Sequence, residues 1–128
     1  MPFDGTEYRT GARQILALLG ENGERWRKDV CWDEDIKAGC LIGALGEATC
    51  IDISENFQGD RYLRLMKLLM AALEHEVSDF GLHHAARRGA PTLAIGDFND
   101  SPETTFADIR RVLDRMHELE IAELTKAS

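Results

Sequence analysis

Residues 61–80 carry the pattern that most limits how this chain can fold. Apolar side chains recur there at intervals of three and four residues, the spacing of one helix face: Tyr62, Leu65, Met66, Leu69, Leu73, Val77 and Phe80. Leu63, Leu68 and Met70 widen this face and leave a narrow polar stripe. A helix that is apolar on most sides has to be covered on most sides. The pattern therefore predicts a central helix of a bundle, with Asp60 as its N-cap.

Two further helices are predicted before this central one. In residues 8–19, apolar positions follow helical spacing, with Thr6 as a suitable N-cap and Gly20 as a suitable end. Residues 38–48 are apolar and rich in small side chains. Each glycine in that segment costs about 1 kcal/mol of helix propensity relative to alanine. Close packing of neighbouring backbones is expected to offset that cost.

The last predicted helix begins after Thr105. Asp108 stands three residues later and completes a capping box in which aspartate replaces the usual glutamate or glutamine. The apolar positions that follow have helical spacing: Phe106, Ile109, Val112, Leu113, Met116 and Leu119. This helix is expected to fray after Leu124.

Two short segments are predicted to be extended. Residues 26–32 alternate in character, and residues 92–95 form a short apolar run that leads into a turn at Gly96. Pairing of residues 26–32 with residues 92–98 would form a small sheet. The sequence thus predicts one domain over residues 1–128, mainly α and at most α+β. Its four helices are joined by short loops and by one or two extended segments.

Charge and length restrict the class of function. The chain has 128 residues and a formal net charge of −8, which disfavours nucleic-acid binding because phosphate contacts need a basic face. No apolar run is long enough for a membrane span, and the N-terminus lacks a signal-peptide core. We therefore expect a soluble, cytoplasmic protein. Its acidic surface suits a basic protein partner, and homo-oligomerisation is left open.

Trp26 and Trp32 are the largest apolar side chains of the chain. We expect both to cover an edge of the core. The alternative is that they form an exposed patch to which a protein partner binds.

The densest group of oxygen-bearing side chains lies around the Gly96 turn, at Asp97, Asn99 and Asp100. A structural interpretation explains them, because Asn and Asp side chains bind backbone amides in turns and acids favour the start of a helix. A calcium loop is the second interpretation. With Asp97 as its first position, the ligand positions fall on Asn99, Ser101, Glu103, Thr105 and Asp108. Pro102 stands where such a loop requires glycine, which argues against this exact loop. The oxygen-bearing side chains still support a more general hypothesis, a divalent cation held by Asp97, Asn99, Asp100 and Asp108.

A third interpretation is phosphodiester chemistry. The segment LAIGDFNDSP resembles a strand-end motif of the endonuclease/exonuclease/phosphatase superfamily, a fold much longer than this chain. That resemblance implies that Asp97 and Asn99 help hold a divalent ion and the scissile phosphate. In a metal-dependent hydrolase of this kind, His83 or His84 would be the general base, which requires direct or one-water contact.

A broader resemblance spans most of the chain. It rests on Gly39-Cys40-Leu41-Ile42-Gly43-Ala44-Leu45, Phe98-Asn99-Asp100, Pro102, Thr105 and Asp108-Ile109. In these motifs the chain is similar to an uncharacterised family of small actinobacterial and phage proteins. Members of that family have a Cys-x-x-Gly-Ala-Leu helix and a Trp-Asn-Asp turn before the final helix. Phe98 stands where tryptophan is usual, and the charged stretch of residues 27–37 resembles an insert. The resemblance implies no activity.

Three functions follow from these patterns. The first is an acidic binding or regulatory domain, an accessory protein of a bacterium or phage, that acts through a protein partner and has no assigned catalytic activity. The second is the metal site or metal-dependent hydrolase at residues 97–100. The third is a module that sequesters a nucleotide or other metabolite between helices or across an oligomer interface. For this third function, Gly39, Gly43 and Gly46 lack the lysine and preceding strand of a phosphate-binding loop. Apart from a divalent cation, no cofactor is predicted.

Overall fold

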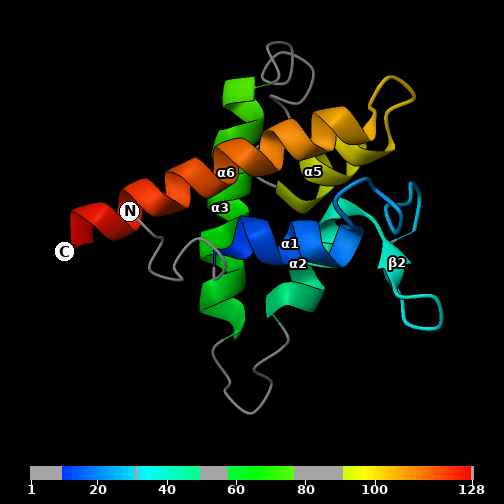
Figure 1. Ribbon diagram of the computed structural model, residues 1–128, viewed down its shortest axis with the longest axis horizontal. Coiled ribbons are helices and arrows are strands. Elements are labelled where there is room, and N and C mark those ends of the chain that lie inside the picture. Colours follow the sequence, from blue (N-terminus) through cyan, green and yellow to red (C-terminus); the bar gives the residue numbers. More distant parts are fainter. Residues whose placement is uncertain (1–9, 31, 50–57, 77–90, 128) are drawn as a thin grey trace.

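The computed structural model describes residues 10–30, 32–49, 58–76 and 91–127 (Figure 1). The prediction of a mainly α fold is confirmed. Five helices and one two-stranded sheet are formed within these residues, in this order: α1 (Gly11–Leu19), β1 (Trp32–Asp33), β2 (Ala38–Gly39), α2 (Leu41–Thr49), α3 (Gln58–Glu76), α5 (Pro91–Asp100) and α6 (Phe106–Ala127). Among the described residues, no helix is both long enough and apolar enough to cross a membrane.

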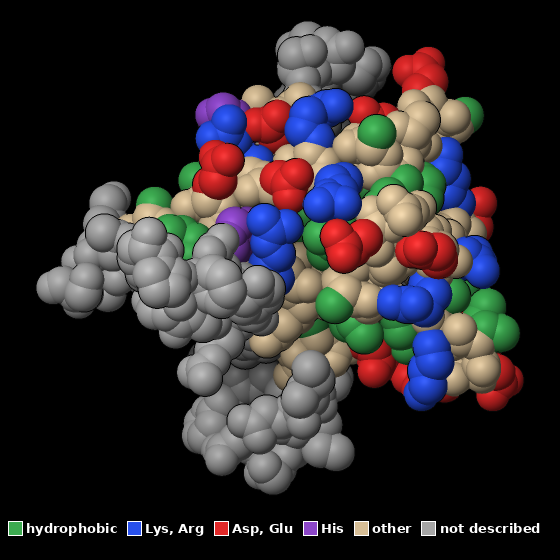
Figure 2. Space-filling model, viewed as in Figure 1, with side chains coloured by type: hydrophobic (Ala, Val, Ile, Leu, Met, Phe, Trp, Pro, Cys, Tyr) green, Lys and Arg blue, Asp and Glu red, His purple; other side chains and the backbone are tan. Residues whose placement is uncertain are grey.

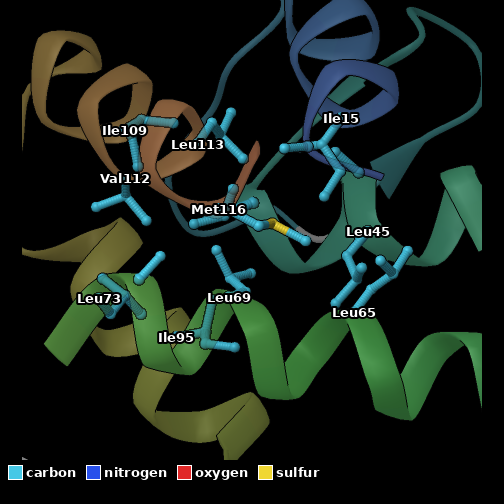
Figure 3. Packing of buried hydrophobic residues seen from close by; sticks show 14 of the residues in the cluster. Ile15, Leu45, Leu65, Leu69, Leu73, Ile95, Ile109, Val112, Leu113 and Met116 are labelled. Atoms are coloured by element: carbon cyan, nitrogen blue, oxygen red, sulfur yellow. The ribbon is translucent and has the colours of Figure 1, made fainter. Parts of the chain in front are cut away.

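Helix α3 lies at the centre of the core, as its apolar pattern predicts. It packs against α2, α5 and α6, while α1 packs against α2 and α6. Leu65, Leu69 and Leu73 of α3 are fully buried. Leu65 lies beside Leu45 of α2, and Leu69 points toward Met116 of α6 (Figure 3). The described helices all contribute apolar side chains to one cluster of buried residues.

The start of α3 differs from the prediction. The helix begins at Gln58, so Asp60 lies within its first turn and is not an N-cap outside it. Residues 77–80 lie outside the described residues. Leu63, which was expected to widen the buried face, is 55% exposed. The helical spacing correctly identifies the core of α3 but overestimates the width of its buried face.

Helix α1 begins at Gly11, and its N-cap is Thr10, where Thr6 was predicted. Thr10 has extended backbone angles, and its hydroxyl oxygen accepts a hydrogen bond from the Arg13 amide at 3.3 Å. Thr6 lies outside the described residues. The predicted end is confirmed, since Gly20 has a φ of 89° and donates its amide to the carbonyl of Leu16.

Residues 92–95 are helical, so the prediction of an extended segment there is wrong. A short apolar run does not distinguish a strand from a buried helix. In α5, Ala94, Ile95 and Phe98 are buried on the side that faces the core. The predicted pairing of residues 26–32 with residues 92–98 is wrong for the same reason.

The small sheet is formed by other strands than the predicted ones. β1 pairs with β2 in antiparallel fashion, so that Trp32 lies opposite Gly39 and Asp33 opposite Ala38. Trp26 forms an isolated bridge to Gly39 on the other side of β2. The hairpin (residues 32–39) projects from the side of the helical bundle (Figure 1). Extended chain near residues 26–32 is thus present, but its partner is the adjacent segment of the sequence.

The capping box at the start of α6 is confirmed. The Asp108 carboxylate accepts hydrogen bonds from the Thr105 amide at 2.9 Å and from the Thr105 hydroxyl at 3.2 Å. In return, the Asp108 amide donates to the Thr105 hydroxyl oxygen. The hydrogen bond from the Thr105 amide, helped by the charge of Arg111, lowers the pKa of Asp108 below its ordinary value of 3.8.

Replacing Asp108 by alanine should lower the free energy of unfolding by about 1 kcal/mol at pH 7. A lowered pKa in the folded state means that this contribution is present above the ordinary pKa and is lost as the pH falls through the folded value. Urea unfolding of both proteins at pH 7 and at pH 3 measures the difference. A gap that stays constant between these pH values would contradict the role of the ionised carboxylate.

Candidate functional site

Asn99, in the last turn of α5, joins three separate segments of the chain. Its side chain is fully buried. Its Oδ1 accepts hydrogen bonds from the Trp26 indole Nε1 at 2.6 Å and from the Leu41 amide at 3.0 Å. Its Nδ2 donates to the Arg27 carbonyl at 3.1 Å and to Asp100 Oδ1 at 2.9 Å. A carboxamide offers two lone pairs and two hydrogens, so this side chain is fully satisfied. We call this group of residues the Asn99 junction.

The residues after Asn99 hold the same neighbouring segment. Asp100 Oδ1 accepts a hydrogen bond from the Asp29 amide at 2.8 Å, and the Ser101 carbonyl accepts one from Lys28 Nζ at 2.6 Å. Lys28 Nζ also lies 5.6 Å from the centre of the Trp26 ring, within cation–π range. Trp26 in turn packs against the Phe106 ring. Residues 26–29 are therefore fixed to the connection between α5 and α6.

This connection is also braced internally. The Thr104 side chain is buried, and its hydroxyl donates to the Phe98 carbonyl at 2.7 Å. The Thr104 amide donates to the Ser101 carbonyl at 3.1 Å. These contacts satisfy carbonyl groups that the end of α5 leaves without helical partners. The predicted turn at Gly96 is wrong, because Gly96 to Asp100 lie within α5; the chain turns after them, at Pro102 and Glu103.

The Asn99 junction and β2 together determine where the hairpin lies. The Arg27 amide donates a hydrogen bond to the Gly39 carbonyl at 2.8 Å, and the Gly39 amide donates one to the Arg25 carbonyl at 3.0 Å. Asp29 and Lys37, which flank most of the projecting segment, have positive φ angles of 62° and 55°. Left-handed backbone is uncommon for residues other than glycine. Such conformations persist only where the surrounding contacts hold them, and they concentrate at functional sites.

Both tryptophans are half-buried and pack against the core, as expected of residues that cover its edge. The Trp26 indole nitrogen is used by Asn99, whereas the Trp32 indole nitrogen is buried without a hydrogen-bond partner. Their role in binding a protein partner stays a prediction.

Residues 7–119 match the model of a family of unknown function, DUF6197. The chain belongs to DUF6197. Comparison with curated proteins found no match, and comparison with solved structures found none either. The matched range contains both motifs of the resemblance, Gly39 to Leu45 and Phe98 to Ile109. The structure shows what connects them, because the Asn99 side chain of the second motif accepts the amide of Leu41 in the first.

Two of the candidate metal ligands of this DUF6197 member, Asn99 and Asp108, are engaged by other groups of the protein. Asn99 Oδ1 is directed to Trp26 and Leu41, and the Asp108 carboxylate is engaged by Thr105 and Arg111. Asp97 lies within α5, so the proposed calcium loop would begin inside a helix. In the part of the chain that the structure describes, no group of three His, Cys, Asp or Glu side chains could hold a metal ion. His83 and His84 lie outside the described residues.

The phosphodiesterase-like motif has a different structural context from the one that its resemblance implies. Gly96, Asp97, Phe98 and Asn99 form the second half of a helix, where the nuclease superfamily has a strand end. The local sequence is similar, but the backbone that would position a metal and a phosphate is different. The metal site itself stays a prediction.

We expect EDTA, calcium, magnesium, manganese and zinc to leave the unfolding temperature unchanged. Binding through Asn99 would break its hydrogen bonds to Trp26 and Leu41. Thermal unfolding of the wild type and of Asp97→Ala with each ion is the measurement. A site saturated 100-fold above its Kd would add about 2.7 kcal/mol of stability. A shift of that size in the wild type, abolished in the variant, would establish a metal site.

Sequence reasoning missed a second buried polar cluster, between α1 and α6. The Glu120 carboxylate is 3% exposed and accepts the amides of Gly11 at 2.8 Å and Ala12 at 2.9 Å. Beside it, Thr10 Oγ1 and His117 Nδ1 lie 2.9 Å apart. A signal was available, because His117 and Glu120 stand four and seven residues after Leu113, the spacing of its buried helix face.

A groove of about 1050 Å³ runs beside α1, where Arg13, Arg25 and Arg110 are among the lining residues. Each guanidinium already has a protein neighbour. Arg13 pairs with Asp114 at 3.2 Å, Arg110 lies 3.9 Å from Glu21, and Arg25 donates to carbonyls at the end of α1. Basic and acidic side chains are accordingly interspersed on this face (Figure 2). The prediction that the protein sequesters a small molecule is not tested by this groove.

Proposed function

We propose that this member of DUF6197 is a binding or regulatory domain that acts through a protein partner and not through catalysis. The observation that carries the proposal is that every hydrogen-bonding position of the Asn99 side chain is occupied by another group of the protein. The most polar segment of the family motifs is occupied with fixing the backbone of residues 26–29 and the start of α2. A group that transfers a proton needs access to a substrate, whereas the Asn99 carboxamide is fully buried.

The Asn99 junction fixes the base of the segment that carries the hairpin, residues 28–40, which we call the projecting segment. Val30 is 40% exposed and Ile36 is 56% exposed. Large apolar side chains on a rigidly held projection are a recurring feature of protein interaction sites. We therefore assign the partner contact to this segment. The resemblance to actinobacterial and phage proteins leads us to propose an accessory protein of a bacterium or phage.

Photo-crosslinking tests the proposal. A photoreactive amino acid at position 36 should join the protein to one predominant partner in an extract of its native cells. The matched control is the same amino acid at position 63, because Leu63 is 55% exposed but lies on α3. The partner, once purified, should bind the wild type and lose affinity for Ile36→Ser. Identical products at positions 36 and 63, or none at position 36, would refute the assignment.

A further inference from the structure

The projecting segment combines apolar and acidic side chains. We define the hairpin surface as Val30, Asp33, Glu34, Asp35 and Ile36. Its two apolar members are exposed, and the carboxylates lie between them in the sequence. Hydrophobic and charged side chains share the edge of the molecule where the hairpin projects (Figure 2).

The charge of the hairpin surface is negative. Lys37 Nζ lies 3.0 Å from Glu34 Oε1 and offsets one of its three carboxylates. This contact lowers the pKa of Glu34 below its ordinary value of 4.5. Asp33 and Asp35 add further negative charge. The formal net charge of −8 has the same sign, so the long-range field of the protein attracts the same kind of partner.

We propose that the hairpin surface docks onto a basic protein segment that offers an apolar contact for Ile36. The inference rests on the proposed function and specifies the chemistry of its partner. Lys and Arg side chains on the partner would complement the carboxylates, while an apolar side chain between them would cover Ile36. Nucleic acids and anionic membranes carry phosphates, which the carboxylates repel.

The backbone that carries this surface is fixed before binding. Asp29 is held by Asp100 at 2.8 Å, and Lys28 is held by the Ser101 carbonyl at 2.6 Å. At the other end, β2 pairs with β1 and is bonded to Arg25 and Arg27. A surface that is already ordered loses less conformational freedom on association, so a small contact can give useful affinity.

The test uses two synthetic helical peptides of equal length, one of leucine and lysine and one of leucine and glutamate. Fluorescence anisotropy should show binding of the lysine peptide to the full chain and none of the glutamate peptide. Ile36→Ser should weaken binding about tenfold, as expected for loss of a buried apolar anchor. The double variant Asp33→Asn, Asp35→Asn should bind less tightly at low salt and depend less on salt concentration. Leu63→Ser is the matched control and should bind as the wild type does.

Three results would overturn the inference: no binding of the lysine peptide, equal binding of both peptides, or equal affinities of Ile36→Ser and Leu63→Ser. Failure here is distinguishable from failure of the proposed function. If photo-crosslinking at position 36 yields a partner whose contact surface is acidic or neutral, the binding function stands and the basic chemistry is wrong. If position 36 yields no partner, the proposed function fails as well.

Discussion

Replacing Asn99 by alanine should lower the free energy of unfolding by about 3–5 kcal/mol. The substitution removes one side chain but leaves several of its partners without hydrogen bonds. Trp26 Nε1 and the Leu41 amide lose their acceptor, and the Arg27 carbonyl loses a donor. Each polar group left buried and unsatisfied costs about 1–3 kcal/mol. Urea unfolding followed by tryptophan fluorescence is suited to the measurement, because Trp26 belongs to the junction.

Two further variants make this result interpretable. Asn99→Asp keeps an oxygen for Trp26 and Leu41 but removes the donor to Arg27 and places a second carboxylate beside Asp100. We expect an intermediate loss of stability, which remains measurable if Asn99→Ala does not fold. Asn22→Ala is the matched control, since Asn22 is exposed. An Asn99→Ala protein within about 1 kcal/mol of the wild type would show that the junction contributes little.

Replacing Glu120 by alanine should cost about 3 kcal/mol of stability. Its carboxylate accepts the amides of Gly11 and Ala12, two donors at the start of α1 that have no partner within the helix. The negative charge also lies at the positive end of the helix dipole. Because the side chain is buried, water cannot replace the carboxylate without entering the contact between α1 and α6.

Glu118→Ala is the control for Glu120→Ala. Glu118 lies on the same helix, but its side chain is 65% exposed and pairs with Arg115. Surface ion pairs of this kind contribute about 0–1 kcal/mol. Glu120→Gln should lie between the two, because an amide retains one acceptor oxygen. Thermal unfolding and urea unfolding should show the largest loss of stability for Glu120→Ala, a smaller loss for Glu120→Gln and the smallest for Glu118→Ala. Equal losses for Glu118→Ala and Glu120→Ala would contradict the role of the buried Glu120 carboxylate.

Sequence periodicity predicted the helices that bury a broad apolar face. The central position of α3 and the capping box at Thr105 both follow from spacing, because one helix face and one local hydrogen-bond pattern determine them. Residues 92–95 were misassigned, since four apolar residues fit a strand and a buried helix equally well. The N-cap at Thr10 was missed because Thr6 has the same residue type and lies at an equally suitable distance.

The Asn99 junction could not be derived from the sequence. Asparagine before a serine and a proline is typical of a turn, and that local property is what the sequence reveals. Its actual partners, Trp26 and Leu41, lie far away along the chain, 73 and 58 residues from Asn99. Only the packing of α5 against α2 brings them within reach. The same limit applies to Glu120, whose role depends on where α1 crosses α6.

The Asn99 junction binds residues on both sides of the hairpin, Trp26 and Arg27 before it and Leu41 after it. The two ends of the intervening segment are therefore anchored to the same side chain, whatever lies between them. Closing a longer loop between fixed ends adds only a small entropic cost. The contacts described above fall on Lys28, Asp29 and β2, so the hairpin tip, residues 34–37, is the part whose length and sequence can change without breaking them. Under the proposed function, such changes alter the partner contact while the packing of the helices stays as it is.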